Sequence, residues 1–137
     1  MKIVEVNTDA LRKEFITFPK RIYRGDPFWV CSLDTEVEAV FDPSKNYVFM
    51  HGEAARWILT GNDGRTIGRV AAFIDRERAK AYRQPTGGMG FFEVIESKEA
   101  AFMLFDTARN WLAERGMEAM DGPINFGEND NYWGLLV

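Results

Sequence analysis

The sequence is poor in the residue types that build disulfides and metal sites. It contains one cysteine, Cys31, and one histidine, His51, among 137 residues. A single cysteine excludes an intrachain disulfide and a cysteine-based zinc site, and we expect Cys31 to be a buried, unreactive thiol. A single histidine excludes a His/His metal pair, and we place His51 in a loop rather than in a catalytic centre. We therefore expect no metal.

Long apolar runs and runs of one charge are also missing. The segment Met1–Glu5 is too polar for the apolar region of a signal peptide, and no stretch approaches the length that spans a bilayer. The expectation is a cytoplasmic protein that does not contact a membrane. The net charge of -4 comes from 21 acidic and 17 basic residues, with no long basic run, so nucleic acid is not an expected partner.

Apolar residues are plentiful and evenly spread. A hydrophobic content of 46%, with 14% aromatic residues, predicts a folded chain rather than a disordered one. No repeat, linker or low-complexity tract divides it, so we interpret residues 1–137 as a single domain. The chain finishes in the apolar run Trp133–Val137, and we expect it to be the N-terminal fragment of a longer protein.

The strongest local pattern is a β-hairpin over residues 57–74, where two apolar runs flank Gly61–Gly64. A buried strand is predicted at 89–95, followed by an amphipathic helix that Ser97 caps and Gly116 ends. Shorter elements are predicted as strands at 3–6 and 117–120, a helix after Thr8 that Pro19 divides into two pieces, and a helix at 34–40. The segment Pro85–Gly88 should interrupt regular structure.

This order of strand, two helices, hairpin, strand, helix and strand resembles the first two thirds of the Gcn5-related N-acetyltransferase (GNAT) fold. The segments Tyr23–Val30 and Gly122–Phe126 are similar to parts of larger bacterial GNAT-like proteins. The resemblance implies an α/β fold with a mixed, mostly antiparallel sheet flanked by helices and lacking the last helix and strands. It also implies an acyl-CoA-dependent N-acyltransferase with an unknown amine or other small molecule as acceptor.

The resemblance implies a cofactor site between the predicted strand at 89–95 and the helix after it. Backbone groups of Glu93, Val94 and Ile95 would pair with the pantetheine arm of acetyl-CoA or another acyl-CoA, which would not be tightly bound. The family grips the pyrophosphate with a loop of pattern Q/R-x-x-G-x-G/A at a helix N-terminus. Here the stretch 96–100 is Glu-Ser-Lys-Glu-Ala, so the loop glycines are missing, two carboxylates oppose the phosphates, and Lys98 offsets part of this repulsion.

Three glycines precede the same predicted strand. Gly87, Gly88 and Gly90 cannot form a phosphate loop, because such a loop follows a strand and opens a helix. We interpret them as a turn or a bulge.

Glu93 is the candidate catalytic residue. Desolvation in an apolar strand favours a general base, and many GNAT enzymes use a glutamate on this strand. In the other interpretation, which we favour, strand alternation points Glu93 at solvent or at an arginine.

The segment 125–133 combines amide side chains with aromatic rings. It is equally compatible with a polar-ligand site that uses Asn125, Asn129 and Asp130 and with an Asx-turn loop that covers the core.

Two functions stay open at this point. One is acyl transfer, with Glu93 as base and backbone N–H groups holding the oxyanion. The other is a degenerate, non-catalytic GNAT-like module that packs on a second half of a longer protein. Such a domain would expose a sheet edge, which could pair two copies of the chain.

Overall fold

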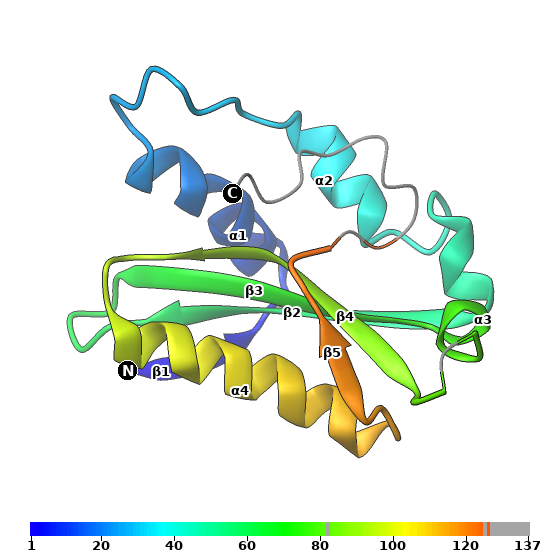
Figure 1. Ribbon diagram of the computed structural model, residues 1–137. Helices are drawn as coiled ribbons and strands as arrows, with labels where there is room; N and C mark the ends of the chain where they lie inside the picture. Colours follow the sequence, from blue (N-terminus) through cyan, green and yellow to red (C-terminus); the bar gives the residue numbers. More distant parts are fainter. Residues whose placement is uncertain (82, 125, 127–137) are drawn as a thin grey trace.

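The computed structural model describes residues 1–81, 83–124 and 126, which build a five-stranded sheet in the order β1-β2-β3-β4-β5 (Figure 1). The strands are β1 (Lys2–Glu5), β2 (Gly52–Thr60), β3 (Thr66–Asp75), β4 (Thr86–Val94) and β5 (Ala119–Asp121). Neighbours from β1 to β4 are antiparallel, and β5 runs parallel to β4. The predicted mixed, mostly antiparallel α/β sheet is confirmed.

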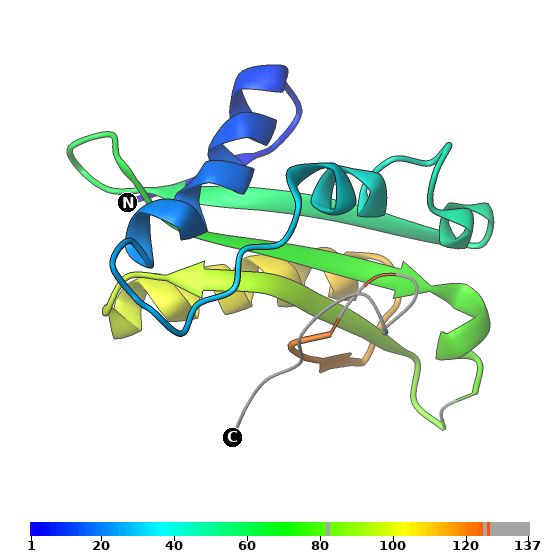
Figure 2. The same ribbon diagram turned by 90° about the horizontal axis from the view of Figure 1, so that it is seen from above.

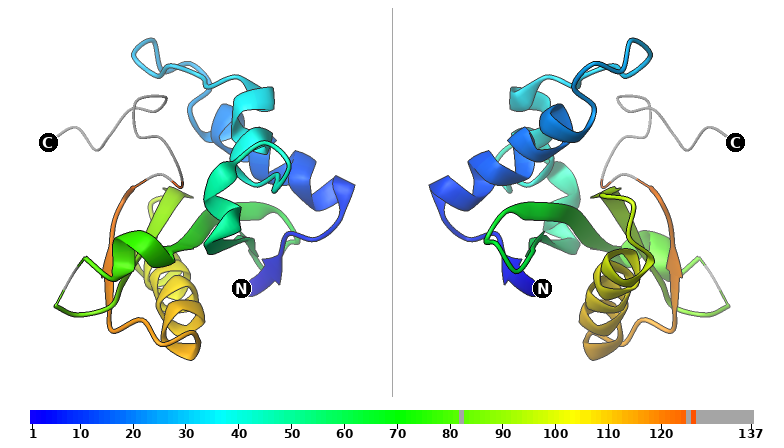
Figure 3. Two further views of the ribbon diagram at one scale, coloured as in Figure 1. Left: turned by 90° about the vertical axis from the view of Figure 1, so that its right-hand side faces the viewer. Right: turned by 90° about the vertical axis from the view of Figure 1, so that its left-hand side faces the viewer.

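Helices cover both faces of this sheet. Helix α4 (Lys98–Glu114) lies on one face, and α1 (Asp9–Ile22) and α2 (Asp34–Val40) lie on the other, as the end-on views of Figure 3 and the view from above in Figure 2 show. Two short elements, the 3-10 helix η1 (Tyr47–Met50) and α3 (Arg76–Ala79), lie near one end of the β2–β3 pair. The helix η1 was not predicted from the sequence.

The face under α4 is apolar. Ser97 caps α4 as predicted, because its Oγ accepts a hydrogen bond from the Ala100 N–H at 3.2 Å, and Gly116 follows the helix with a φ of +85°. The buried side chains of this layer are Trp57, Leu59, Val70, Ala72, Ile74, Met89, Ala100, Leu104, Ala108 and Leu112.

The face under α1 and α2 mixes aromatic rings with buried charge. Its apolar members include Phe15, Val37, Ile58, Phe73 and Phe126. Arg56 and Arg69 lie in the same layer and are only 5% and 7% exposed. Strand alternation places both arginines on this face, since Arg56 precedes Ile58 by two residues and Arg69 precedes Ala71 by two.

Helix α1 is one helix, so the prediction that Pro19 divides it was wrong. Proline lacks the N–H that would bond the carbonyl four residues earlier, which belongs to Phe15. Here that carbonyl accepts a hydrogen bond from Arg69 Nη1 at 2.7 Å. A side chain from the sheet thus uses the acceptor that the proline leaves, and the helix continues to Ile22.

Strand β4 begins at Thr86, so the prediction of a break over Pro85–Gly88 was also wrong. Gly87 and Gly88 lie within the strand, and a Cβ on Gly88 would lie 2.3 Å from Ile124 Cδ1. Gly90 stands beside a bulge, as expected for one of the two interpretations, and a Cβ there would lie 2.0 Å from the Ile124 carbonyl oxygen. The glycines therefore allow the chain after β5 to cross β4.

Other differences are local. The hairpin begins earlier than predicted, because β2 extends back to Gly52. Cys31 is exposed rather than buried, since the loop between α1 and α2 projects from the body of the protein.

Candidate active site

The end of β4 carries an irregularity that exposes backbone groups. Phe91 has a φ of 51°, and the β3–β4 register shifts between Arg69 and Ala71, which marks a bulge. Beyond it Glu93 is the register partner of Arg69, and the Ile95 N–H bonds the Ile67 carbonyl at 3.0 Å. Because backbone groups alternate sides along a strand, Phe92 and Val94 direct theirs away from β3.

The strand β5 does not reach this part of β4. It pairs with Thr86, Gly87 and Gly88, and the Ile124 N–H then bonds the Met89 carbonyl at 2.8 Å. Within residues 1–81, 83–124 and 126, no backbone pairing of β4 on the β5 side extends beyond Met89. As far as the described residues go, this edge at the end of β4 (the open edge) is free for a ligand that pairs as a strand does.

The predicted cofactor residues differ in the direction of their backbone groups. Val94 faces the open edge, whereas Glu93 and Ile95 direct their backbone groups to β3. Phe92 also faces the edge, although it was not among the residues predicted from the sequence, because the bulge shifts the alternation of the backbone groups by one residue.

The Glu93 side chain points to the α1 side of the sheet and is partly buried. The Tyr23 hydroxyl, at the end of α1, donates a hydrogen bond to its carboxylate. Burial, together with this neighbouring carboxylate, raises the pKa of the Tyr23 hydroxyl, so it stays protonated at neutral pH. The sequence favours the interpretation that Glu93 points at solvent or at an arginine. Arg69 is indeed the cross-strand partner of Glu93, but the hydrogen bond from Tyr23 was not predicted.

Arg69, the cross-strand partner of Glu93, supplies positive charge near this carboxylate. Its guanidinium lies 4.7 Å from the centre of the Phe15 ring and 5.6 Å from that of Phe91. Burial lowers the pKa of Arg69 to about 10, and the Glu93 carboxylate opposes that shift. The Arg69 Nε is buried without a hydrogen-bond partner in the described part of the chain. The open edge therefore adjoins three polar side chains: the partly buried Glu93 carboxylate, the protonated Tyr23 phenol and the buried Arg69 guanidinium.

The start of α4, where the resemblance places a phosphate grip, keeps the predicted departures. Glu96, Lys98 and Glu99 are exposed, and Ser97 Oγ already takes the Ala100 N–H. The Lys98 Nζ lies 5.5 Å from the centre of the Phe102 ring. This terminus fits a pyrophosphate poorly, because two carboxylates stand beside it and a side chain occupies one of its N–H groups.

The predicted acceptor residues Asn125, Asn129 and Asp130 lie outside the described residues. In the ranges that the structure describes, no group of histidine, cysteine, aspartate or glutamate side chains could hold a metal ion. His51 Nε2, at the end of η1, lies 3.6 Å from a carboxylate oxygen of Asp75, which is at the opposite end of β3 from the register partner of Glu93. No described helix is both long enough and apolar enough to cross a bilayer.

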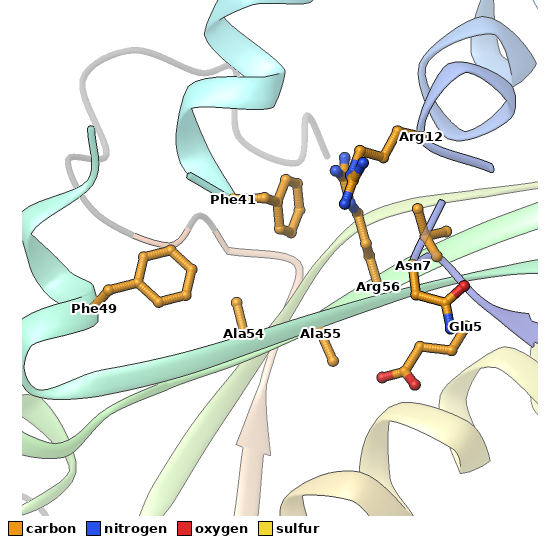
Figure 4. A pocket seen from close by; sticks show the side chains of 9 residues that line it. Glu5, Asn7, Arg12, Phe41, Phe49, Ala54, Ala55 and Arg56 are labelled. Carbon is orange, nitrogen blue, oxygen red and sulfur yellow. The ribbon is translucent and has the colours of Figure 1, made fainter. Parts of the chain in front are cut away.

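A cavity of about 270 Å³ lies at the β1–β2 edge of the sheet, and none of its described lining residues belongs to β4. Figure 4 shows Arg12 and Arg56 pointing toward the same space, with Phe41 beside them. The Arg56 guanidinium already has partners within the protein. Its two terminal nitrogens donate hydrogen bonds to the Glu38 carboxylate at 3.0 and 3.2 Å, and it lies 4.2 Å from the centre of the Phe41 ring. We assign this cavity no ligand.

Comparison with known sequences finds two bacterial relatives. The chain is 35% identical to the bacterial ceramide synthase of Caulobacter vibrioides over 142 residues, which is 100% of this chain and 35% of that protein. It is 28% identical to protein YghO of Escherichia coli over 128 residues, which is 91% of this chain and 31% of YghO. The chain thus spans about a third of the length of these curated relatives. No protein-family model matches it.

Comparison with solved structures finds two acetyltransferases. One is a putative acetyl transferase from Pyrococcus furiosus, with a TM-score of 0.55 and 18% identity, covering 95% of this chain and 84% of that one. The other is an acetyltransferase of the GNAT family from Staphylococcus aureus, with a TM-score of 0.59 and 15% identity, covering 87% of this chain and 69% of that one. At these identities the likeness establishes the fold.

Proposed function

We propose that this chain, whose fold is that of the GNAT-like superfamily, is the part of an acyl-CoA-dependent N-acyltransferase that binds the thioester and activates the amine. The observation that carries the proposal is the open edge at the end of β4, which stands beside the partly buried Glu93 carboxylate. Attack of an amine on a thioester needs a site that holds the thioester and a base that accepts the amine's proton. The open edge would hold the thioester, and the Glu93 carboxylate would be the base.

The edge suits the pantetheine arm of acyl-CoA. That arm contains two amide groups, and the backbone groups of Phe92 and Val94 face the edge, where none of the described residues pairs with them. The first N–H beyond the bulge, that of Phe92, would donate to the thioester carbonyl oxygen as charge develops there. The exposed carboxylates at the start of α4 do not favour the pyrophosphate, so we expect weak binding that depends mainly on the arm.

Glu93 is proposed as the general base. The nitrogen of a neutral amine attacks the thioester carbonyl carbon, so that a C–N bond forms and the C–S bond breaks. The proton that leaves the nitrogen passes to the Glu93 carboxylate, and solvent returns one proton to the departing thiolate. Tyr23 holds the carboxylate in place until the amine arrives, and Arg69 stabilises its charge from behind.

The name of one relative supports amide formation. A ceramide is an amide of a long-chain amine, so a ceramide synthase is named for joining an acyl group to nitrogen. The chain covers 35% of that relative, and we propose that it contributes the acyl-transfer part of such a protein.

Binding is the first test of the proposal. Titration of the folded chain with acetyl-CoA, followed by thermal shift, should give a stabilisation that saturates. Absence of any shift at millimolar ligand would contradict acyl-CoA binding and favour the non-catalytic module, which the missing loop glycines also favour.

Catalysis is the second test. With an amine panel and detection of the released thiol, Glu93→Gln should lower the rate about a hundredfold or more while leaving acetyl-CoA binding intact. Glu96→Gln is the matched control, because this carboxylate is exposed and lies only three residues away. It should keep the rate, and it should bind acetyl-CoA slightly more tightly because one repulsive charge is gone.

A further inference from the structure

One residue of the loop between α1 and α2 turns toward the protein. Residues 24–31 are all exposed except Trp29, which is partly buried. The Trp29 ring stacks on the Tyr23 ring, with centroids 5.2 Å apart and planes inclined by 24°. Stacked aromatic rings at this separation attract one another beyond the gain from burying their apolar area. Trp29 therefore connects the loop to the end of α1.

Hydrogen bonds of the backbone hold the two rings in position to stack. Tyr23 ends α1, where its N–H bonds the Pro19 carbonyl at 3.0 Å. The chain then turns, because the Asp26 N–H bonds the Tyr23 carbonyl at 2.9 Å and the Phe28 N–H bonds the Asp26 carboxylate at 2.9 Å. The Trp29 ring thus lies against a tyrosine whose backbone is fixed, and the stack restricts the rotation of the tyrosine side chain.

Tyr23 passes this restriction on to the candidate base. Its hydroxyl donates a hydrogen bond to Oε2 of Glu93. A glutamate side chain has several rotamers, and a hydrogen bond to one carboxylate oxygen selects among them. The other oxygen, Oε1, keeps its capacity to accept a proton. The orientation of the Glu93 carboxylate therefore depends on Tyr23, and the orientation of Tyr23 depends on Trp29.

We propose that Trp29 is a positioning residue of the candidate active site, which acts through Tyr23 to present Oε1 of Glu93 to the acceptor amine. This inference rests on the proposed function, because it takes Glu93 as the base. Trp29 itself touches neither the amine nor acyl-CoA. The loop between α1 and α2 consequently controls the rate of acyl transfer, since any displacement of the loop that separates the two rings releases the base from its productive orientation.

The first test needs no substrate. The full chain is labelled with carboxyl-¹³C glutamate, and the NMR signal of Glu93 is identified by its absence in Glu93→Gln. Tyr23→Phe should move this signal, because the hydrogen bond is lost. Trp29→Leu should move it in the same direction by at least about half as much. Phe28→Leu is the matched control, since Phe28 is the neighbouring aromatic residue but is 91% exposed, and it should leave the signal in place.

The second test measures acetyl transfer from acetyl-CoA to benzylamine. Trp29→Leu should lower kcat about tenfold and leave the KM for acetyl-CoA within about twofold, because the base is misplaced while the open edge is intact. Trp29→Phe should recover most of this loss, since a phenylalanine ring can also stack on Tyr23. In a Tyr23→Phe background, Trp29→Leu should lower kcat by less than about twofold, because Trp29 then has no hydrogen bond to direct.

The outcomes separate this inference from the proposed function. An unmoved Glu93 signal in Trp29→Leu would overturn the role of Trp29, whatever the rate of the wild type. An equal fall in kcat with and without the Tyr23 hydroxyl would also overturn it, because Trp29 would then act by another route. Absence of acetyl transfer by the wild type, with a Glu93 signal that still follows Trp29, would contradict the proposed function alone.

Discussion

The two faces of the sheet are built from different chemistry. The α4 face buries aliphatic side chains and tryptophan, whereas the face under α1 and α2 buries Arg56 and Arg69 among phenylalanine rings. Burial of apolar area stabilises a fold without demanding partners, but each buried guanidinium requires hydrogen bonds and compensating charge. We infer that the α4 face supplies most of the folding free energy and that the opposite face arranges the groups around Glu93.

The largest effect on stability should come from the α4 face. Leu104 is fully buried, so Leu104→Ala should lower the free energy of unfolding by about 3 kcal/mol, measured by urea denaturation. Phe102→Ala, on the same helix but half exposed, serves as control and should cost much less. A loss of less than about 1 kcal/mol in the free energy of unfolding for Leu104→Ala would contradict the assignment of stability to the α4 face. Weaker acetyl-CoA binding by the folded Leu104→Ala protein would contradict the assignment of the site to the other face.

An intermediate effect should come from the charge on the other face. Glu38→Gln leaves the buried Arg56 guanidinium without its carboxylate and should cost about 2 kcal/mol, less than for a wholly buried pair because Glu38 is partly exposed. Adding Arg56→Met should restore part of this loss, since methionine can pack against the Phe41 ring. Urea denaturation of the two single variants and the double variant measures the coupling. Additive losses would show that Arg56 and Glu38 do not depend on one another.

The smallest effect is expected at Pro19. In an ordinary helix interior, replacing proline by alanine gains about 3 kcal/mol. Here Pro19→Ala should change the free energy of unfolding by less than about 1 kcal/mol, because the new N–H competes with Arg69 for the Phe15 carbonyl. In an Arg69→Met background the same substitution should be more favourable. An equal gain in both backgrounds would rule out the link between proline and arginine.

Local sequence signals were enough to predict most elements of the fold. The hairpin turn at Gly61–Gly64 and the Ser97 cap are chemical features of a few neighbouring residues, and both predictions were confirmed. The predictions that were wrong concern residues whose conformation depends on partners far away in the sequence. Pro19 stays within a helix because Arg69 approaches it from the sheet, and Thr86–Gly90 form a strand because another segment crosses there.

The candidate site could be predicted only in part. Glu93 was found because a carboxylate within an apolar strand is conspicuous. Tyr23 was missed because its contact spans 70 residues of sequence, and Phe92 was missed because a bulge changes which backbone groups face the edge. A signal for the buried arginines did exist, since period-two alternation aligns Arg56 with Ile58 and Arg69 with Ala71.

The crossing of Ile124 over β4 limits what sequences can share this architecture. The main chain of Ile124 fills the space that a side chain at position 90 would need, and the Ile124 side chain fills the space at position 88. In a saturation library, position 90 should therefore tolerate almost no residue except glycine, whereas position 88 should tolerate more because the Ile124 side chain can move. In related genomes, alternate glycines in an apolar strand followed later by Gly-Pro would identify proteins that make the same crossing, even where overall identity has been lost.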